Sequence, residues 1–286
     1  MGTLGSASLN TPKLWLGTGS RFDEAQWPEF RRPIVIFDSG VGGLTVVREL
    51  EKLAPNNNIL YVADNDWFPY GNKTGSDIAQ RFEKLLDELC TKVDPEAIVV
   101  ACNTASVAIV DHGTENLRRK CFLVTPQINE AVDASKTKCI VFLATAGTLN
   151  SNHVIHALAR SKMSARVWPI ATQVLVMLAE AMLAGEEVNF ENVEKLICLH
   201  LTNEQRLSVD TVVLGCTHFP LLIDGLRKIF PAAYNWIDPA RAVASQVVTS
   251  IGTESESTGE ISKVATFTSE CKAVKYCQVF SRNGFS

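Results

Sequence analysis

The feature that most constrains the fold is a series of short, continuously apolar runs separated by amphipathic stretches. The runs are rich in β-branched residues and are bounded by turn residues. They lie at Ile34 to Phe37, Ile59 to Val62, Ala97 to Ala101, Phe122 to Val124, Cys139 to Leu143 and Thr211 to Leu214. Continuous apolar strands with helices between them are typical of parallel sheets that are covered on both faces. The sequence therefore predicts an α/β fold from Pro33 onward.

The intervening stretches carry apolar residues at helical spacing. One such face is formed by Ile78, Phe82, Leu85, Leu86, Leu89 and Val93. Because several of the strand and helix units before residue 240 are short, we predict two small sheets rather than one large sheet. A boundary between them is expected near Thr125-Pro126, and a solvated linker at Gly252 to Glu260 should precede a last strand at Val264 to Thr268.

Composition excludes several classes of protein. The 286 residues carry 27 Lys and Arg against 31 Asp and Glu, a net charge of −4, whereas nucleic-acid-binding proteins usually show a basic excess. No apolar run approaches the roughly 18 to 20 residues of a membrane helix, and the N-terminus lacks the pattern of a secretory signal. We therefore expect a cytoplasmic protein that binds neither nucleic acid nor membranes. Residues 1–32, rich in Gly, Ser and Thr, are expected to form a flexible extension.

The metal-ligating residue types show no site-like spacing. The eight cysteines include no Cys-x-x-Cys pair, which argues against a zinc site. His153 and His156 are three residues apart on an expected helix, but no third ligand lies nearby. We therefore predict no metal site.

Polar clusters follow several of the predicted strands, where α/β proteins bind ligands. Asp38 to Gly43 follows the first strand, Cys102 to Ser106 follows the third, and Cys216 to His218 follows the sixth. A further loop, Asp64 to Lys73, follows the second strand. The glycines of the first cluster match neither the dinucleotide fingerprint nor a P-loop, although they would expose backbone N–H groups to an anion.

Two cysteines stand in matching local sequences. Cys102 and Cys216 each end a buried strand, are followed by Thr within two residues, and are expected to begin a helix. A helix N-terminus stabilises a thiolate and lowers the pKa of its thiol. These features leave a packing role and a chemical role equally open. Two thiols facing each other across a substrate would suit inversion of a carbon centre, with one removing a proton and the other delivering one to the opposite face.

Four motifs resemble those of glutamate racemases, within the cofactor-independent aspartate/glutamate racemase superfamily. They are Phe37-Asp38-Ser39-Gly40-Val41-Gly42-Gly43-Leu44, Pro69-Tyr70-Gly71, Ala101-Cys102-Asn103-Thr104-Ala105-Ser106 and Leu214-Gly215-Cys216-Thr217-His218-Phe219-Pro220-Leu221. They occur in the family's order. The resemblance extends from about Pro33 to about Val248, and the first 32 residues and the tail lie outside it.

The resemblance implies two similar α/β domains with mainly parallel sheets and an active site in the cleft between them. Residues 33–126 plus 240–286 would form the first domain, and residues 127–239 the second. Such enzymes interconvert L- and D-glutamate without pyridoxal phosphate or metal, and D-glutamate supplies peptidoglycan synthesis. Family members commonly form homodimers, and a peptidoglycan precursor regulates some of them.

The resemblance also implies catalytic roles. Cys102 matches the cysteine that handles the proton of the D isomer, and Cys216 matches the one that handles the proton of the L isomer. Asp38 would lie close to Cys102 and contact the substrate amino group. His218 matches a residue that assists the second cysteine, and Glu180 matches an acidic residue near it.

The remaining residues implied by the resemblance bind the substrate. Ser39 joins Asp38 at the amino group, while Asn103, Thr104 and Thr217 hold the α-carboxylate. Tyr70 and Gly71 match contacts to the side-chain carboxylate through backbone N–H groups. The expected substrate-binding set is Asp38, Ser39, Pro69, Tyr70, Gly71, Asn103, Thr104, Thr145, Thr217 and His218.

Three alternatives stay open at this level. An aspartate racemase would keep the mechanism and change the substrate. A thiol hydrolase would use Cys216 as nucleophile and His218 as base, leaving Cys102 unexplained. A non-catalytic module would close on an acidic amino acid without turning it over.

Overall fold

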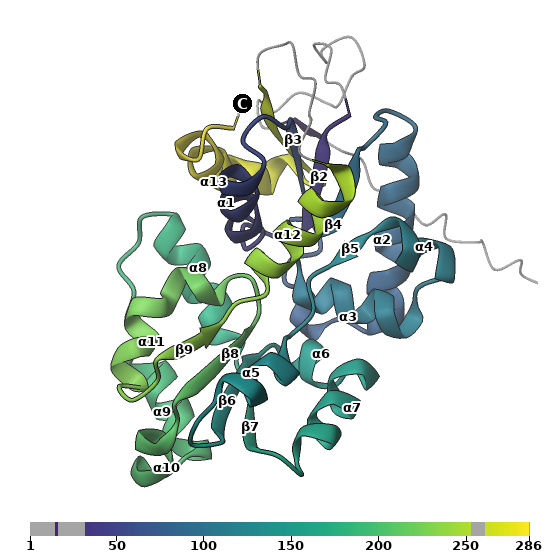
Figure 1. Cartoon of the computed structure of the whole chain (residues 1–286). Coiled ribbons are helices and arrows are strands. Elements are labelled where there is room, and N and C mark those ends of the chain that lie inside the picture. The colour runs from purple at the N-terminus through teal and green to yellow at the C-terminus, as the bar shows by residue number, and fades with distance from the viewer. Residues whose placement is uncertain (1–14, 17–31, 253–260, 286) are drawn as a thin grey trace, which may run out of the picture.

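The computed structural model describes residues 15–16, 32–252 and 261–285, and it contains two sheets, one above the other in Figure 1. Sheet A has the strand order β1-β10-β3-β2-β4-β5, and sheet B has the order β7-β6-β8-β9. The strands of sheet A are β1 (Trp15–Leu16), β2 (Ile34–Asp38), β3 (Ile59–Ala63), β4 (Ala97–Val100), β5 (Phe122–Leu123) and β10 (Lys263–Phe267). Those of sheet B are β6 (Cys139–Ala144), β7 (Arg166–Ala171), β8 (Thr211–Gly215) and β9 (Asn235–Ile237).

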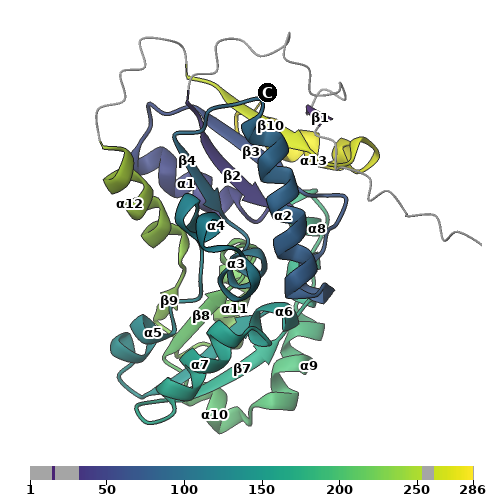
Figure 2. The same ribbon diagram turned by 90° about the vertical axis from the view of Figure 1, so that its right-hand side faces the viewer.

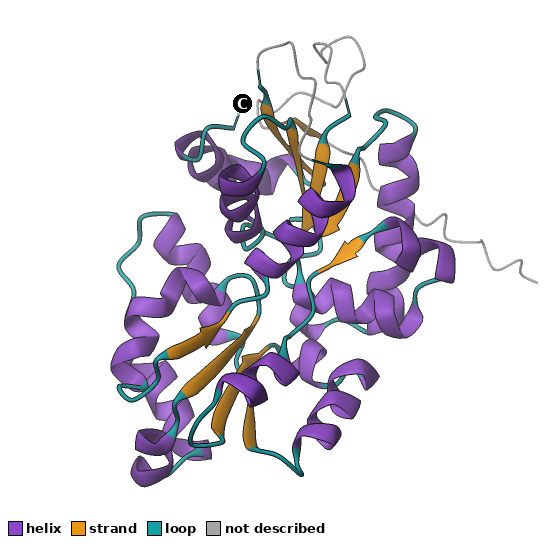
Figure 3. Cartoon of the chain, viewed as in Figure 1, coloured by secondary structure: helices purple, strands orange, loops and turns teal. Residues whose placement is uncertain are grey.

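Helices separate nearly all consecutive strands, as the purple and orange elements of Figure 3 show. The α-helices are α1 (Leu44–Leu53), α2 (Gly75–Cys90), α3 (Asn103–His112), α4 (Glu115–Lys120), α5 (Ile128–Ala134), α6 (Ala146–Leu149), α7 (Asn152–Ser161), α8 (Val174–Leu183), α9 (Glu191–His200), α10 (Asn203–Ser208), α11 (Ile223–Ile229), α12 (Ala240–Ile251) and α13 (Glu270–Arg282). The described residues also form the 3₁₀-helices η2 (Tyr70–Asn72) and η3 (Phe219–Leu222).

Sheet A is parallel except at β1, which pairs antiparallel with β10. Its two faces are covered by different helices. Ile34 and Ile36 pack with α1, α12 and α13, whereas Val35 and Phe37 pack with α2 and α3. Successive residues of one strand are therefore buried on opposite faces, which explains why the strand is continuously apolar. The predicted α/β class with two mainly parallel sheets is confirmed.

Sheet B is parallel throughout its described pairs. Helices α8, α9 and α11 cover one face and α5 and α7 the other. Val107 of α3 joins the second of these clusters with Phe142 and Val154, and α3 also contacts α6 and α7. Figure 2 shows α3 where the two sheets and their helices meet. We call each sheet with its covering helices a unit. Helix α3 therefore packs with both units.

Three strands were not predicted. In β7, half of the residues are exposed and Pro169 interrupts the apolar run, which an edge strand tolerates. β9 has only three residues, each half-buried. β1 lies within the predicted flexible extension, and its backbone pairs Trp15 with Phe267 at the edge of sheet A. Such short or edge strands lack the buried run that identifies the central strands.

Other predictions for the chain ends fall mostly outside the described residues. Residues 1–14 and 17–31 of the expected extension, and residues 253–260 of the expected linker, belong to those segments. Within the described residues, no helix combines the length and apolar character needed to cross a membrane.

Candidate active site

In each sheet, the connections that leave the carboxyl ends of two adjacent strands run to opposite sides of the sheet. β3 and β4 lie on opposite sides of β2 in sheet A, and β7 and β8 lie on opposite sides of β6 in sheet B. Ligands of open α/β sheets bind at such switch points. Cys102 comes two residues after β4, and Cys216 comes directly after β8. The two cysteines therefore lie at the switch points of the two sheets.

Cys102 is the N-cap of α3 and is 7% exposed. Its Sγ lies 3.7 Å from Oγ of Ser39. Burial, together with the negative charge of Asp38, raises the pKa of the Cys102 thiol to about 12, and this outweighs the lowering by the Ala105 N–H and Ser39. The prediction of a lowered pKa at this helix N-terminus is therefore wrong for Cys102, because desolvation exceeds the helix effect.

Cys216 is equally buried, but it does not begin an α-helix as predicted. A turn follows, in which the Phe219 N–H donates to the Cys216 carbonyl at 3.0 Å, and then η3 begins. Pro220 explains the difference, because it has no N–H to donate back to Cys216 in an α-helical turn. The chain instead places His218 beside the thiol, with its Nδ1 3.7 Å from Sγ.

His218 joins Cys216 to Glu180. Its Nε2 lies 2.8 Å from Oε1 of Glu180, which projects from α8. Burial alone would lower the pKa of His218, but the hydrogen bonds and negative charges of Cys216 and Glu180 raise it well above its ordinary value. Tyr276 of α13 also contacts Glu180, and burial and this carboxylate raise the pKa of the phenol. These two partners therefore favour the protonated form of the His218 ring.

Asp38 lies at the end of β2, between the two cysteine environments. Its side chain is completely buried, and its carboxylate accepts from the Gly40 N–H at 2.7 Å and from Oγ1 of Thr217 at 3.1 Å. Burial raises the pKa of Asp38, although the nearby His218 and these two hydrogen bonds lower it. The carboxylate therefore connects the loop after β2 with the loop after β8.

The loop between β2 and α1 touches residues of sheet B's unit because its glycines lack side chains. A Cβ built on Gly42 would lie 2.5 Å from Nδ1 of His218, and one on Gly40 would lie 2.6 Å from Oε1 of Glu180. The Val41 N–H donates to the same Glu180 oxygen at 3.3 Å. The close approach therefore requires glycine at positions 40 and 42.

Tyr61 holds the loop between β2 and α1 by a hydrogen bond. Its buried hydroxyl donates to the Gly40 carbonyl at 3.0 Å, and its ring packs edge-on against Phe280 of α13, with centroids 4.7 Å apart. The loop that presents Asp38 thus depends on the C-terminal helix. Sequence analysis missed Tyr61, since a tyrosine in an apolar strand has the pattern of a core residue.

Three threonine hydroxyls form a second bridge between the units. Oγ1 of Thr104, on α3, lies 2.9 Å from Thr145 and 3.2 Å from Thr148, and the latter two are 3.0 Å apart. Thr145 also caps α6 by accepting from the Thr148 N–H. Thr148 was not among the predicted residues, although its spacing from Thr145 is that of a cap and its third helical residue.

Asn103 precedes Thr104 at the start of α3. Its Nδ2 donates to the Val124 carbonyl at 3.2 Å, while its Oδ1 is buried and has no hydrogen-bond partner among the described residues. The side chain therefore offers an acceptor to a ligand, and N–H groups at this end of the helix offer donors.

The loop after β3 is held by a buried carboxylate that was not predicted. Tyr70 in η2 donates from its hydroxyl to Asp64 Oδ2 at 2.6 Å, and the Arg81 guanidinium and Thr268 hydroxyl also donate to Asp64 at 2.6 Å. The phenol of Tyr70 thus points to Asp64. Pro69 is the N-cap of η2. Asp64 directly follows β3, much as Asp38 ends β2, and this place at the carboxyl edge of the sheet could have indicated it.

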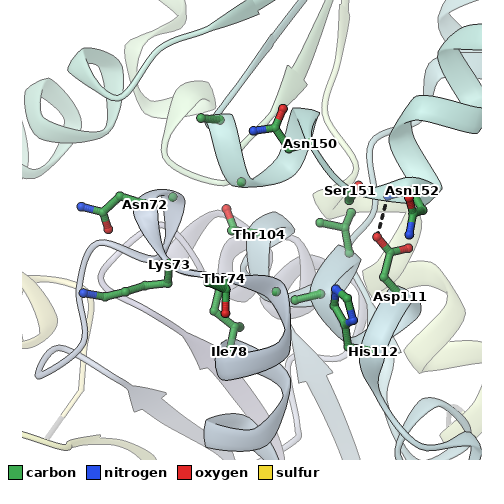
Figure 4. Close-up of a pocket in the computed structure, with 16 residues that line it drawn as sticks. Asn72, Lys73, Thr74, Ile78, Thr104, Asp111, His112, Asn150, Ser151 and Asn152 are labelled. Carbon is green, nitrogen blue, oxygen red and sulfur yellow. Dashed lines mark hydrogen bonds between the residues drawn. The ribbon is translucent and has the colours of Figure 1, made fainter.

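Gly71 brings η2 against the loops after β6 and β7. A Cβ on Gly71 would lie 2.5 Å from Oε1 of Gln173 and 2.9 Å from Cβ of Thr145. Next to it, a cavity of ≈ 550 Å³ opens between η2, α3 and the start of α7. Figure 4 shows Thr104 and Lys73 at its lining, and Asp111 of α3 accepts from the Asn152 N–H at 2.6 Å. Neither cysteine lines this cavity, but Gly71 and Thr104 belong to both it and the predicted site.

The structure thus gathers the predicted residues into one region where the two units meet. Each thiol has its own partners: Ser39 and Asp38 beside Cys102, and His218 beside Cys216. Burial raises the pKa of the Cys102 thiol, whereas Cys216 faces a histidine whose protonated form is favoured, so the two thiols lie in chemically different surroundings. Among the described residues, no group of three or more His, Cys, Asp or Glu has an arrangement that could hold a metal ion.

Comparison with known proteins gives a consistent result. The Asp/Glu/Hydantoin racemase family matches residues 43–247. The glutamate racemase of Brucella anthropi is 34% identical over 218 residues, covering 76% of this chain and 78% of that protein, and that of Shewanella halifaxensis is 35% identical over 215 residues, covering 75% and 79%. The Escherichia coli glutamate racemase, solved with L-glutamate and the activator UDP-MurNAc-Ala, superposes with a TM-score of 0.75 at 30% identity, covering 89% of this chain and 96% of that one. Bacillus anthracis RacE1 gives a TM-score of 0.64 at 26% identity, covering 82% and 87%.

Proposed function

This chain belongs to the Asp/Glu/Hydantoin racemase family and is an amino-acid racemase, and we propose that its substrate is glutamate, which it interconverts between the L and D forms. The mechanism we propose is a 1,1-proton transfer between the α-carbon and two thiols, without a cofactor. The observation that carries the proposal is the pair of buried thiols, Cys102 and Cys216, at the switch points of two sheets.

In this mechanism one thiolate removes the α-proton and the other thiol delivers a proton to the opposite face. Cys216 would remove the proton of L-glutamate, with the His218 imidazolium stabilising its thiolate, and Cys102 would supply its proton to give D-glutamate. The raised pKa of Cys102 supports this direction, because the thiol keeps its proton until it is needed. In the reverse direction the two exchange roles, so Cys102 must lose its proton once substrate is bound.

The substrate would be held by the residues around the thiols. Asp38 and Ser39 would contact the amino group. Thr104, Thr217 and the backbone N–H of Asn103 would hold the α-carboxylate, since the unpaired side-chain atom of Asn103 is an acceptor. The backbone N–H groups of Tyr70 and Gly71 would bind the side-chain carboxylate, with Pro69 and Thr145 beside them. Support comes from the contacts of Thr217 with Asp38 and of Thr104 with Thr145, which draw these residues together.

The experiment that tests the proposal is incubation of the protein with L-glutamate in D₂O without added cofactor. Optical rotation and deuterium at the α-carbon are followed together, with L-aspartate in parallel. We expect loss of rotation and α-deuteration on glutamate. Cys102→Ala and Cys216→Ala should abolish both, while Cys198→Ala, at an exposed cysteine, should change neither.

The other outcomes separate the alternatives. Racemisation of aspartate alone would replace the substrate and keep the mechanism. The contact between Cys216 and His218 would also suit a thiol hydrolase, which would remain active as Cys102→Ala and would form a covalent adduct. Binding of glutamate without deuterium exchange would indicate a binding module. No exchange on either amino acid would exclude a racemase of either kind.

We further propose that the enzyme is a cytoplasmic homodimer, that its D-glutamate supplies peptidoglycan synthesis, and that a peptidoglycan precursor activates it. The support for activation is the similarity to the Escherichia coli enzyme, which was solved with such an activator. Racemisation should be faster with UDP-MurNAc-Ala than with UDP, and light scattering should give twice the mass of 31.3 kDa. Equal rates with both nucleotides would exclude the activation.

A further inference from the structure

Gln173 carries a buried amide nitrogen that has no partner among the described residues. The residue is the N-cap of α8, and its carbonyl accepts from the Val176 and Met177 N–H groups at 3.1 and 3.3 Å. These bonds fix its backbone. Its Nε2 is buried, yet it has no hydrogen-bond partner among the described residues. Buried polar groups are nearly always paired, so this donor is available to a polar group that binds beside it.

The Gln173 amide lies beside Gly71 of η2. Oε1 of Gln173 is 2.5 Å from the position that a Cβ on Gly71 would occupy, and Thr145 lies 2.9 Å from the same position. Gln173 comes from the loop after β7 in sheet B, whereas Gly71 comes from the loop after β3 in sheet A. The amide therefore faces η2 across the meeting point of the two units, and only a glycine leaves room for it there.

From this placement we propose that Gln173 is a substrate-binding residue that donates a hydrogen bond from Nε2 to the side-chain carboxylate of glutamate. The inference rests on the proposed function and adds a specificity residue to it. The α-carbon must lie between Cys102 and Cys216, so the α-amino and α-carboxylate groups lie beside the thiols. Gln173 lies instead against Gly71, on which Thr145 also closes, and this place suits the more distant carboxylate.

The chemistry of the side chain fits this role. A carboxylate accepts hydrogen bonds, and a neutral amide supplies a donor whose bond to a charged group is stronger than an ordinary one. The side-chain carboxylate of aspartate is one methylene closer to the α-carbon and would fall short of Gln173. The residue would therefore contribute to the preference for glutamate over aspartate.

The test compares Gln173→Leu and Gln173→Glu with wild-type enzyme and with Gln246→Leu, a matched control on the exposed face of α12. For Gln173→Leu we expect the KM for both isomers of glutamate to rise roughly tenfold to a hundredfold, with a smaller change in kcat, since one hydrogen bond to a charged group is lost. Gln173→Glu should raise KM further because it places a carboxylate against a carboxylate. The control should behave as wild type.

Thermal unfolding without ligand separates a binding role from a structural one. Replacing an unpaired buried amide by Leu should leave the Tm unchanged or raise it, whereas a structural amide would lower it. Added D-glutamate should raise the Tm less for the variant than for wild type.

Two results would overturn the inference and are distinguishable from failure of the proposed function. An unchanged KM for both Gln173 variants, while wild type racemises glutamate, would remove Gln173 from the substrate site and leave the racemase intact. A raised KM accompanied by a lowered Tm would assign Gln173 a structural role. Wild-type protein that does not racemise glutamate would refute the proposed function itself, and this inference with it.

Discussion

The Glu180 carboxylate lies 2.8 Å from Nε2 of His218, on the opposite side of the ring from the nitrogen that faces Cys216. Thirty-eight positions separate the two residues in sequence, and each comes from a different element of the sheet B unit. The ring therefore bridges the Glu180 carboxylate and the Cys216 thiol. The other thiol, Cys102, lies beside the Ser39 hydroxyl and near the Asp38 carboxylate, so the surroundings of the two thiols differ chemically.

Replacing His218 with Asn should lower kcat about a hundredfold or more, because a positioned group that assists proton transfer contributes roughly 10² to 10⁴ in rate. Glu180→Gln keeps a partner for the ring but removes the charge that raises the pKa of His218. The decrease of kcat at high pH should therefore begin at a lower pH in Glu180→Gln than in wild type. Steady-state rates between pH 6 and 10 measure both effects. His156→Asn, on the exposed side of α7, is the control, and an unchanged kcat in His218→Asn would refute the role.

Cys102 should react slowly with iodoacetamide at pH 8, because burial and Asp38 raise its pKa to about 12 and only the thiolate is alkylated. Asp38→Asn removes the second of these causes. We expect labelling of Cys102 to accelerate, by about tenfold for each unit by which the pKa falls. Peptide mass spectrometry measures the rate, with the exposed Cys198 as an internal standard. Equal rates for Cys102 in the variant and wild type would contradict the assigned influence of Asp38.

Arg81→Met should lower the free energy of unfolding by about 3 kcal/mol, because it leaves the fully buried Asp64 carboxylate without its cationic partner. A double variant, Arg81→Met with Asp64→Leu, should recover part of this loss. Lys272→Met is the comparison: Lys272 pairs with Asp66 at the surface, where an ion pair contributes about 1 kcal/mol or less. Urea titrations measure the free energies of unfolding of these three variants and of wild type. Similar losses for Arg81→Met and Lys272→Met would show that burial of Asp64 has no energetic effect.

Asp210 makes the free energy of unfolding depend on pH. Burial alone would raise its pKa, but hydrogen bonds from Ser135, Thr211 and two backbone N–H groups lower it from 3.8 to about 2. The folded pKa lies below the unfolded one, so the stabilisation is complete above pH 4 and is lost as the pH falls towards 2. Asp210→Asn should therefore cost about 1 kcal/mol at pH 7, after allowing for solvent screening, and less at pH 3. A difference that does not shrink on acidification would exclude this cause.

Sequence analysis found the central strands and the two thiols for a local reason. A strand such as β2, buried on both faces, has to be apolar at every position, and the residue that follows it has to lie at the sheet edge. Asp38, Cys102 and Cys216 stand out by that position, and the motifs around them then indicate their roles. The edge strand β7 was not predicted, because its exposed residues and Pro169 interrupt the apolar run.

What the sequence could not reveal depends on contacts between distant segments. The pKa of Cys102 is governed by burial and by a carboxylate 64 positions away, so a rule based on its own helix gave the wrong direction. Arg81 belongs to an ordinary amphipathic pattern until Asp64 is placed beside it. The orphan amide of Gln173 is defined only by what surrounds it in three dimensions.

The position of β10 has a consequence for biosynthesis. This strand fills the place beside β3 in sheet A, yet its residues are translated after every strand of sheet B. A nascent chain on the ribosome therefore exposes one edge of β3 throughout synthesis of the sheet B unit, and such an edge can pair with other chains. Tyr61 receives its Phe280 contact only when the last helix emerges. The loop that presents Asp38 is thus completed at the end of translation, and products terminated early would lack an assembled site.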